Sequence, residues 1–285
     1  MNYHSLEPNL EYIKIYPKEY NIVELQYKHI LHYRHNNKEY IIDNERIQKK
    51  LEKKSIENDS FVIRIFDNKI TEVFSKYFVP LQKSTILNIL DRYLPNSYKL
   101  VNKNYDIYRD QLWLEYIDTD PMFKEGEISH RLFILNKNDA KTSFRLIHGF
   151  TINTCLNAVI SQKVFKMRTV HKADKNKVIK NIIGLIYKAV GYRYETYEKH
   201  KELYEKSKLT DISIRDGIDY INNTSNRYSK KIIDKVTNRF IHNEQKTVLG
   251  LSNAFSYTGT HLTNSQNISY NLRREAYNVI EYFLN

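Results

Sequence analysis

The chain has few of the residues that form cross-links and few of those that interrupt regular structure. Its 285 residues include one cysteine, Cys155, which excludes an intramolecular disulfide framework and a zinc site of clustered cysteines, and which suits a reducing compartment. With 7 glycines and 5 prolines there is little room for linkers or disordered tracts. Because Cys155 lies in the run NTCLNAV, we expect a small buried thiol rather than a nucleophile.

Long apolar runs and glycine-rich loops are also missing. No apolar run reaches the ~18 residues of a membrane-spanning helix, and the polar start MNYHSLEPNLEYIKIYPKEY does not resemble a signal peptide, so we expect a soluble cytoplasmic protein. The glycines are too dispersed for a phosphate-binding loop, and no serine or cysteine lies between flanking glycines. We therefore predict no cofactor and favour a protein that is not an enzyme.

Positive charge is abundant and unevenly distributed. The net charge is +12, yet residues 1–162 contain 23 basic and 21 acidic residues, a balance of only +2. Residues 163–246 contain 20 basic and 10 acidic residues, and residues 247–285 contain two of each. A localised basic excess predicts binding to a polyanion, because neutralising phosphates releases condensed counterions. A lysine-rich surface that is merely solvated is the alternative.

Alternating apolar residues predict β-strands in the first half. FVIRIF (61–66), the turn residues Asp67-Asn68 and KITEVFS (69–75) are typical of a hairpin. Further strands are expected in QLWLEYID (111–118), ISHRLFILN (128–136), TSFRLIHGFTIN (142–153) and AVISQKVFKMRT (158–169). Short helices are expected at residues 43–55 and in STILNILDRYL (84–94), where Ser84 can cap and Ile86, Ile89, Leu90 and Tyr93 share one face.

The pattern becomes helical near Asp174. In residues 174–208 the apolar positions recur at helical spacing, which predicts one long helix or two, with Gly184 or Gly191 as weak points. Residues 210–221, 225–245 and 267–285 are expected to form further helices. The fold class is therefore α+β, with an antiparallel β-rich N-terminal half and a helical, basic C-terminal half. We expect an N-terminal extension (1–60), a β-rich core with one helix (61–173) and a helical region (174–285) that packs on the core; the last two can form one domain.

The predicted nucleic-acid-binding residues are basic side chains interleaved with aromatic ones. A basic strand that leads into a helix can follow a phosphate backbone, and exposed rings can stack on bases. Residues 162–177 contribute Lys163, Phe165, Lys166, Arg168, His171, Lys172, Lys175 and Lys177. In the following helical region Tyr187, Tyr192, Tyr194 and Tyr197 are interleaved with Lys188 and Arg193. Residues 225–245 contribute Lys231, Lys235 and Arg239, four residues apart along one helix face. The alternative is that the tyrosines pack between helices and the lysines face water.

Three weaker groupings could bind a metal ion. On a helix, His29, His32 and His35 would share one face. Strand alternation places Asp118 and Asp120 on the face opposite Glu115, where the two aspartates could hold a divalent cation, although an Asp-rich turn is the simpler reading. An acidic pair with a lysine, typical of some nucleases, could also be drawn from Asp67, Glu72 and Lys76.

Several motifs resemble the phage- and plasmid-borne proteins grouped as the domain of unknown function DUF932. The similarity lies in FVIRIFDNKITEVFSKYFVPLQKSTILNILDRYLP, with matches at Arg64, Ser75, Tyr77, Pro80 and Leu81, and in DQLWLEYID. It continues through GEISHRLFILNKNDAKTSFRLIHGF, CLNAV, RTVH and REAYNVIEYF. The chain departs from the family pattern at Ala158, where the family has glycine, and in NKNDA. The resemblance implies a shared fold and an origin on a mobile element in a bacterial host cell, and no agreed activity.

These observations favour a non-catalytic protein that binds or anneals single-stranded nucleic acid during the replication or recombination of a phage or plasmid. The predicted partner is nucleic acid, with single strands favoured. A second copy of the chain is a further candidate partner, and no membrane is expected. A metal-dependent nuclease that uses acidic residues at strand ends is one alternative. A phage structural or host-interaction protein, whose basicity reflects the composition of its proteome, is another.

Overall fold

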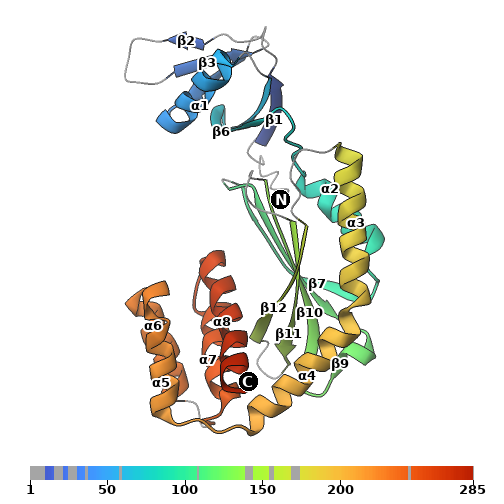
Figure 1. Cartoon of the computed structure of the whole chain (residues 1–285), viewed down its shortest axis with the longest axis vertical. Helices are drawn as coiled ribbons and strands as arrows, with labels where there is room; N and C mark the ends of the chain where they lie inside the picture. Colours follow the sequence, from blue (N-terminus) through green and yellow to red (C-terminus); the bar gives the residue numbers. More distant parts are fainter. Residues whose placement is uncertain are drawn as a thin grey trace, which may run out of the picture.

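Two β-sheets follow one another in the computed structural model of the chain, and helices cover both faces of the second (Figure 1). The structure describes residues 10–15, 22–24, 31–35, 38–57, 60–107, 109–138, 144–153, 157–167, 174–242 and 245–284. For residues 22–24, 31–35, 39, 55–56, 125 and 162–167 it describes the backbone alone. Antiparallel sheets in the N-terminal half and helices in the C-terminal half confirm the predicted α+β class.

The first sheet has the strand order β1-β5-β6-β4-β3-β2 and pairs antiparallel except between β4 and β6. Its strands are β1 (Leu10–Ile15), β2 (Ile22–Glu24), β3 (Leu31–His35), β4 (Lys38–Ile42), β5 (Phe61–Phe66) and β6 (Lys69–Ser75). Helix α1 (Glu45–Ile56) buries Ile47 and Leu51 against this sheet. The sheet spans the expected boundary at residue 60, because β5 pairs with β1 from Leu10↔Phe66 to Ile15↔Phe61.

The hairpin of β5 and β6 forms as predicted. Asp67 and Asn68 adopt φ values of 51° and 57°, the left-handed region that tight hairpin turns require and that Asp and Asn tolerate well. Both faces of β5 are buried. Phe61, Ile63 and Ile65 face the core beneath α1, whereas Val62 packs with Phe74 and Phe78 on the other face.

The second sheet is an antiparallel meander in the order β12-β11-β10-β8-β7, with the short β9 paired to β10. Its strands are β7 (Tyr98–Asp106), β8 (Gln111–Asp118), β9 (Lys124–Glu125), β10 (Ile128–Lys137), β11 (Phe144–Ile152) and β12 (Asn157–Met167). Four of these match the predicted strands. Strand β7 was not predicted, because residues 99–103 are all exposed at the sheet edge and show no apolar alternation.

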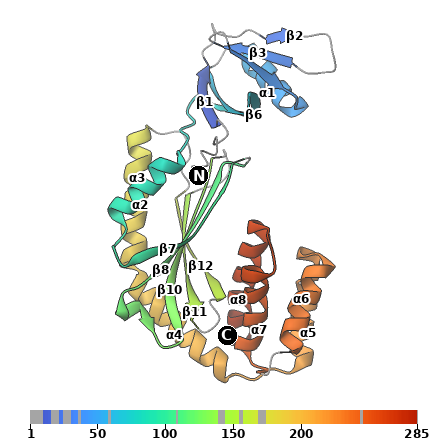
Figure 2. The ribbon, with the colours of Figure 1, turned by 180° about the vertical axis from the view of Figure 1, so that it is seen from behind.

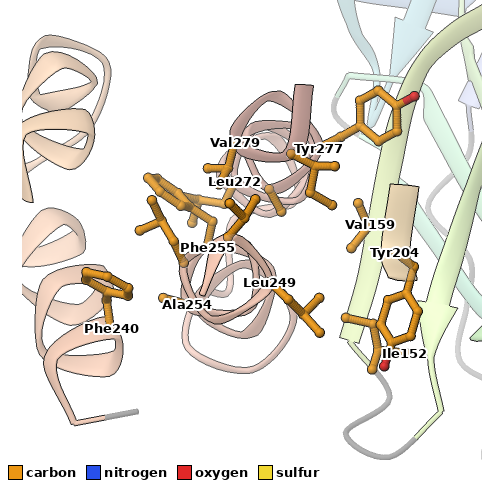
Figure 3. Close-up of a cluster of buried hydrophobic side chains, with 14 of the residues drawn as sticks. Ile152, Val159, Tyr204, Phe240, Leu249, Ala254, Phe255, Leu272, Tyr277 and Val279 are labelled. Atoms are coloured by element: carbon orange, nitrogen blue, oxygen red, sulfur yellow. The ribbon is translucent and has the colours of Figure 1, made fainter. Parts of the chain in front are cut away.

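Helices form a layer on each face of this sheet (Figures 1 and 2). Helices α2 (Lys83–Tyr93), α3 (Lys175–Gly191) and α4 (Arg193–Leu209) cover one face, and α7 (Val248–His261) and α8 (Gln266–Leu284) cover the other. Helices α5 (Ile214–Asn223) and α6 (Lys230–Ile241) stand outside α7, and two single turns, η2 (Pro121–Phe123) and η3 (Ser225–Arg227), join elements. The main apolar cluster fills the space between the sheet, α7, α8 and α6 (Figure 3).

One expectation about local structure was wrong, and one helix was not predicted. Helix α2 begins at Lys83, with Gln82 rather than Ser84 as its N-cap, and Gln82 makes no capping hydrogen bond through its side chain. Helix α7 was not predicted, because it is apolar around most of its circumference and therefore lacks an amphipathic period. The break in residues 174–208 was anticipated, since α3 ends at Gly191.

A small polar cluster joins the two sheets. The carboxylate of Asp110, which is 3% exposed, accepts hydrogen bonds from the hydroxyls of Tyr12 on β1 and Tyr105 on β7, the latter at 2.7 Å. It also accepts the amide of Asn138 at 2.8 Å. Asn138 in turn exchanges hydrogen bonds of 2.9 and 2.8 Å with the backbone of Leu81. One buried carboxylate therefore links β1 of the first sheet to the segment that precedes α2.

Candidate nucleic-acid interface

Helix α3 has an apolar face and a basic face. It begins at Asp174, whose side chain accepts the backbone N–H of Asn176 at 3.3 Å. Its buried residues, which pack on α2 and the sheet, are Val178, Ile182, Ile186 and Ala189. Its exposed charged residues are Lys175, Lys177, Lys180 and Lys188. Because α3 itself contains no acidic residue, three of these ammonium groups, those of Lys177, Lys180 and Lys188, form a positive stripe about 17 Å long on its outer face at 1.5 Å per residue.

Exposed tyrosines continue this stripe at the junction of α3 and α4. Tyr187 is 59% exposed, Tyr192 46% and Tyr194 56%, so each presents ring surface to solvent. Tyr197 was grouped with them in the sequence pattern, but it is fully buried against Phe123. Exposed rings beside lysines are the combination that binds unpaired bases, because every base can stack on an aromatic face.

Sequence reasoning missed three residues of this surface. Lys180 extends the lysine stripe, and Arg92 and Tyr93 reach it from α2. The Tyr93 ring meets the edge of Tyr187 with centroids 6.2 Å apart, and the Arg92 guanidinium lies 5.6 Å from the Tyr93 centroid. Helical spacing had placed Tyr93 with the buried side chains of its helix, and only the packing of α2 beside α3 shows that its ring meets Tyr187 (Figure 1). We call Lys177, Lys180, Tyr187, Lys188, Tyr192 and Tyr194 the α3 face.

Arg193, a predicted phosphate contact, is paired within the protein. Its guanidinium lies 3.2 Å from the carboxylate of Asp118, which is fully buried, and 3.7 Å from that of Asp120. It also lies 4.4 Å from the ring centroid of Phe123. Arg193 therefore anchors the start of α4 to the end of β8, and it ion-pairs both aspartates of the predicted cation site.

Glu115 lies on the opposite face of β8 from Asp118, as alternation predicted. Its carboxylate, 1% exposed, accepts hydrogen bonds from the Trp113 indole at 2.7 Å and from Arg273 of α8 at 2.9 Å, and it pairs with Arg131 at 3.1 Å. Burial alone would raise the pKa of Glu115, but Arg273 and Arg131 outweigh it and hold that pKa below its usual value. This cluster fixes α8 to the sheet.

The other candidate metal-binding groupings do not assemble. Residues 31–35 form a strand rather than a helix, so the expected helical face of histidines does not form, and His29 lies outside the described residues. Asp67 occupies the hairpin turn, whereas Glu72 pairs with Lys50 of α1. Among the described residues no group of three or more His, Cys, Asp or Glu side chains could hold a metal ion.

The remaining predicted residues lie in three places. Lys163, Phe165 and Lys166 lie in β12, an edge strand of the second sheet, where the structure describes their backbone alone. Arg168, His171 and Lys172, like Cys155, lie outside the described residues. The three from α6 lie on the opposite side of the molecule from α3 (Figures 1 and 2): Lys231 is exposed, the Lys235 ammonium donates to the Leu262 carbonyl at 2.9 Å, and Arg239 lies 4.1 Å from the Tyr257 centroid.

Comparison with known proteins adds no relative. No family model matches the chain, and no curated protein or solved structure matches it either. The resemblance to DUF932 therefore stays a prediction. In the part of the chain that the structure describes, no helix is long and apolar enough to span a bilayer.

Proposed function

We propose that the protein binds single-stranded nucleic acid through the α3 face, without acting on it chemically. The observation that carries this proposal is the lysine stripe of α3, which contains no acidic residue and continues into three exposed tyrosines. Lysines along a helix attract a phosphate backbone irrespective of its sequence. Tyrosine rings can stack on unpaired bases. They cannot stack on the bases of a duplex, because those faces already stack on neighbouring base pairs.

The first test is a salt titration of binding to single- and double-stranded oligonucleotides. Replacing Lys177, Lys180 and Lys188 by Gln should weaken binding and lower the slope of log K against log salt by about 2, because each phosphate neutralised on a single strand adds ~0.7 to that slope. The matched control replaces Lys49, Lys53 and Lys54 of α1, which are ion-paired with Glu45 or Glu57. It removes the same charge and should change the slope far less.

The tyrosines separate single-strand from duplex binding. Tyr187→Ala should weaken single-strand binding by roughly five- to a hundred-fold, which corresponds to about 1–3 kcal/mol of stacking, and should leave duplex binding nearly unchanged. Tyr282→Ala is the control, because Tyr282 is 67% exposed but lies on α8, away from α3. No shift at micromolar protein and low salt would overturn the proposal, as would equal effects of the α3 and α1 lysine variants.

A further inference from the structure

Three histidines from separate elements meet in the interior beneath α4. His130 of β10 and His148 of β11 are both fully buried, and the Nε2 of His130 lies 2.8 Å from the Nδ1 of His148. We call these two residues the histidine pair. His200 of α4 is 1% exposed and belongs to the same cluster, with its ring 5.4 Å from that of Phe150 on β11.

Among the described residues, the charged and titratable groups that act on His130 are His148, His200 and Arg193, all of which disfavour its protonation. From α4 the histidine pair faces His200 and the guanidinium of Arg193. The ring centroid of Tyr98 on β7 lies 6.0 Å from that of His130. The ring centroid of Tyr277 on α8 lies 5.8 Å from that of His200. The guanidinium of Arg193 is itself ion-paired with the buried carboxylate of Asp118 on β8. A proton added to the cluster would therefore lie next to positive charge in a dry environment.

The hydrogen bond within the pair also resists protonation. An N–H···N bond between two imidazoles requires a lone pair on one of them, so both rings cannot be imidazolium at once. Burial, followed by the neighbouring His148, His200 and Arg193, holds the pKa of His130 well below its usual value. Once exposed to water, the same ring titrates near pH 6.5. The folded form therefore binds fewer protons than an opened form, and its stability is full above about pH 6.5 and falls below it.

Helix α4 covers the histidine pair, so a loss of stability at low pH would affect this helix first. Most of its outward residues are charged. Its buried residues are Thr196, Tyr197, His200, Tyr204 and Ser207, of which two are small and polar and one belongs to the histidine cluster. By contrast, α3 covers its part of the sheet with aliphatic side chains alone. Segments with few buried apolar contacts open at lower free energy than the whole fold.

We propose that the histidine pair is a pH-sensitive latch, which holds α4 on the second sheet above about pH 6.5 and releases this helix as the pH falls. Each proton gained on opening makes the opening equilibrium about ten-fold more favourable per pH unit. The latch is independent of the nucleic-acid proposal, because its readout is the motion of α4 in the protein alone.

Hydrogen exchange of the full chain between pH 7.5 and 5.0 tests the latch, with rates corrected for intrinsic exchange. The α4 amides should lose protection about ten-fold per pH unit below pH 6.5, while those of α1 in the first sheet keep theirs. His130→Gln, whose amide can still hydrogen-bond to His148, should reduce this pH dependence. His242→Gln is the matched control, because His242 is exposed at the end of α6 and should leave the dependence intact.

Three results would overturn the latch. Constant α4 protection across this range would overturn the proposal, and so would a loss that is as steep in His130→Gln as in the natural chain. If His130→Gln does not fold, His148→Gln serves in its place, since it removes the other half of the same bond. A loss of protection that spreads equally to α1 would also overturn the latch, because it would mean global acid unfolding.

Discussion

Replacing Glu115 by Gln should destabilise the protein far more than its single atomic change suggests. The glutamine keeps the size of the side chain and can still accept the Trp113 indole N–H, but it removes the negative charge that pairs with Arg131 and Arg273. Arg131 is 9% exposed and Arg273 3%, so two cations would be left buried without a counter-charge. Breaking a buried ion pair on one side typically costs about 3–5 kcal/mol, and we expect a loss of this size.

Urea unfolding followed by the fluorescence of Trp113 measures this loss at the site itself. Trp113 is the single tryptophan of the chain, is 3% exposed and touches the altered side chain, so its emission reports on the unit that contains the cluster. Glu202→Gln is the control. Glu202 pairs with Lys206 at 2.6 Å but both side chains are about 60% exposed, and such pairs contribute about 1 kcal/mol or less.

Acid should remove the difference between the natural chain and Glu115→Gln. Because the pKa of Glu115 is lowered in the folded state, its contribution is complete above the unfolded value of about 4.3 and is lost as the pH falls through the folded one. Adding Arg273→Met to Glu115→Gln should restore part of the stability by removing one unpaired cation. A loss no larger than that of Glu202→Gln at pH 7 would refute the reasoning.

Three further substitutions test the packing, each by urea unfolding followed with circular dichroism. Gly149→Ala should cost about 3 kcal/mol or more, because the new Cβ would lie 2.2 Å from the Val159 carbonyl oxygen and force β11 and β12 apart; a neutral result would contradict this close approach. Gly184→Ala should instead stabilise α3 by about 1 kcal/mol, because its Cβ would meet open space, and a loss would show a hidden contact. Asp110→Asn should cost about 2 kcal/mol, since an amide cannot accept from Tyr12, Tyr105 and Asn138 together; an unchanged midpoint would show that the sheets do not depend on this carboxylate.

Local patterns in the sequence predicted those elements whose signals are local. The β5–β6 hairpin follows from alternation and Asp67-Asn68, and α3 follows from apolar residues at helical spacing. Strand β7 and helix α7 were not predicted for opposite reasons, since residues 99–103 of β7 are all exposed and α7 is buried nearly all round. Neither element therefore shows the alternation of buried and exposed positions that a periodicity search detects.

The roles of individual charges were harder to predict, because they depend on partners far away in the sequence. Arg193 and Lys188 look alike in the sequence as basic residues beside tyrosines. The fold pairs Arg193 with Asp118, 75 residues earlier, and leaves Lys188 exposed. Likewise Tyr187 lies on the exposed face of α3, whereas Tyr197 lies on the buried face of α4 and packs against Phe123. Charge composition indicated the basic region. Only the tertiary fold shows which of its basic residues are exposed and which are paired within the protein.

The bond between Glu115 and Arg273 also sets an order of events during synthesis. These residues lie 158 positions apart, so at about 5–20 residues per second the ribosome needs roughly 8–30 s to deliver the second after the first. Over that interval the nascent second sheet has no α8 to cover Trp113, Phe133 and Ile147. The first sheet is complete once Ser75 has emerged, and it needs no such wait. The exposed face of the second sheet is therefore where a chaperone would engage the growing chain, and where truncated chains would aggregate.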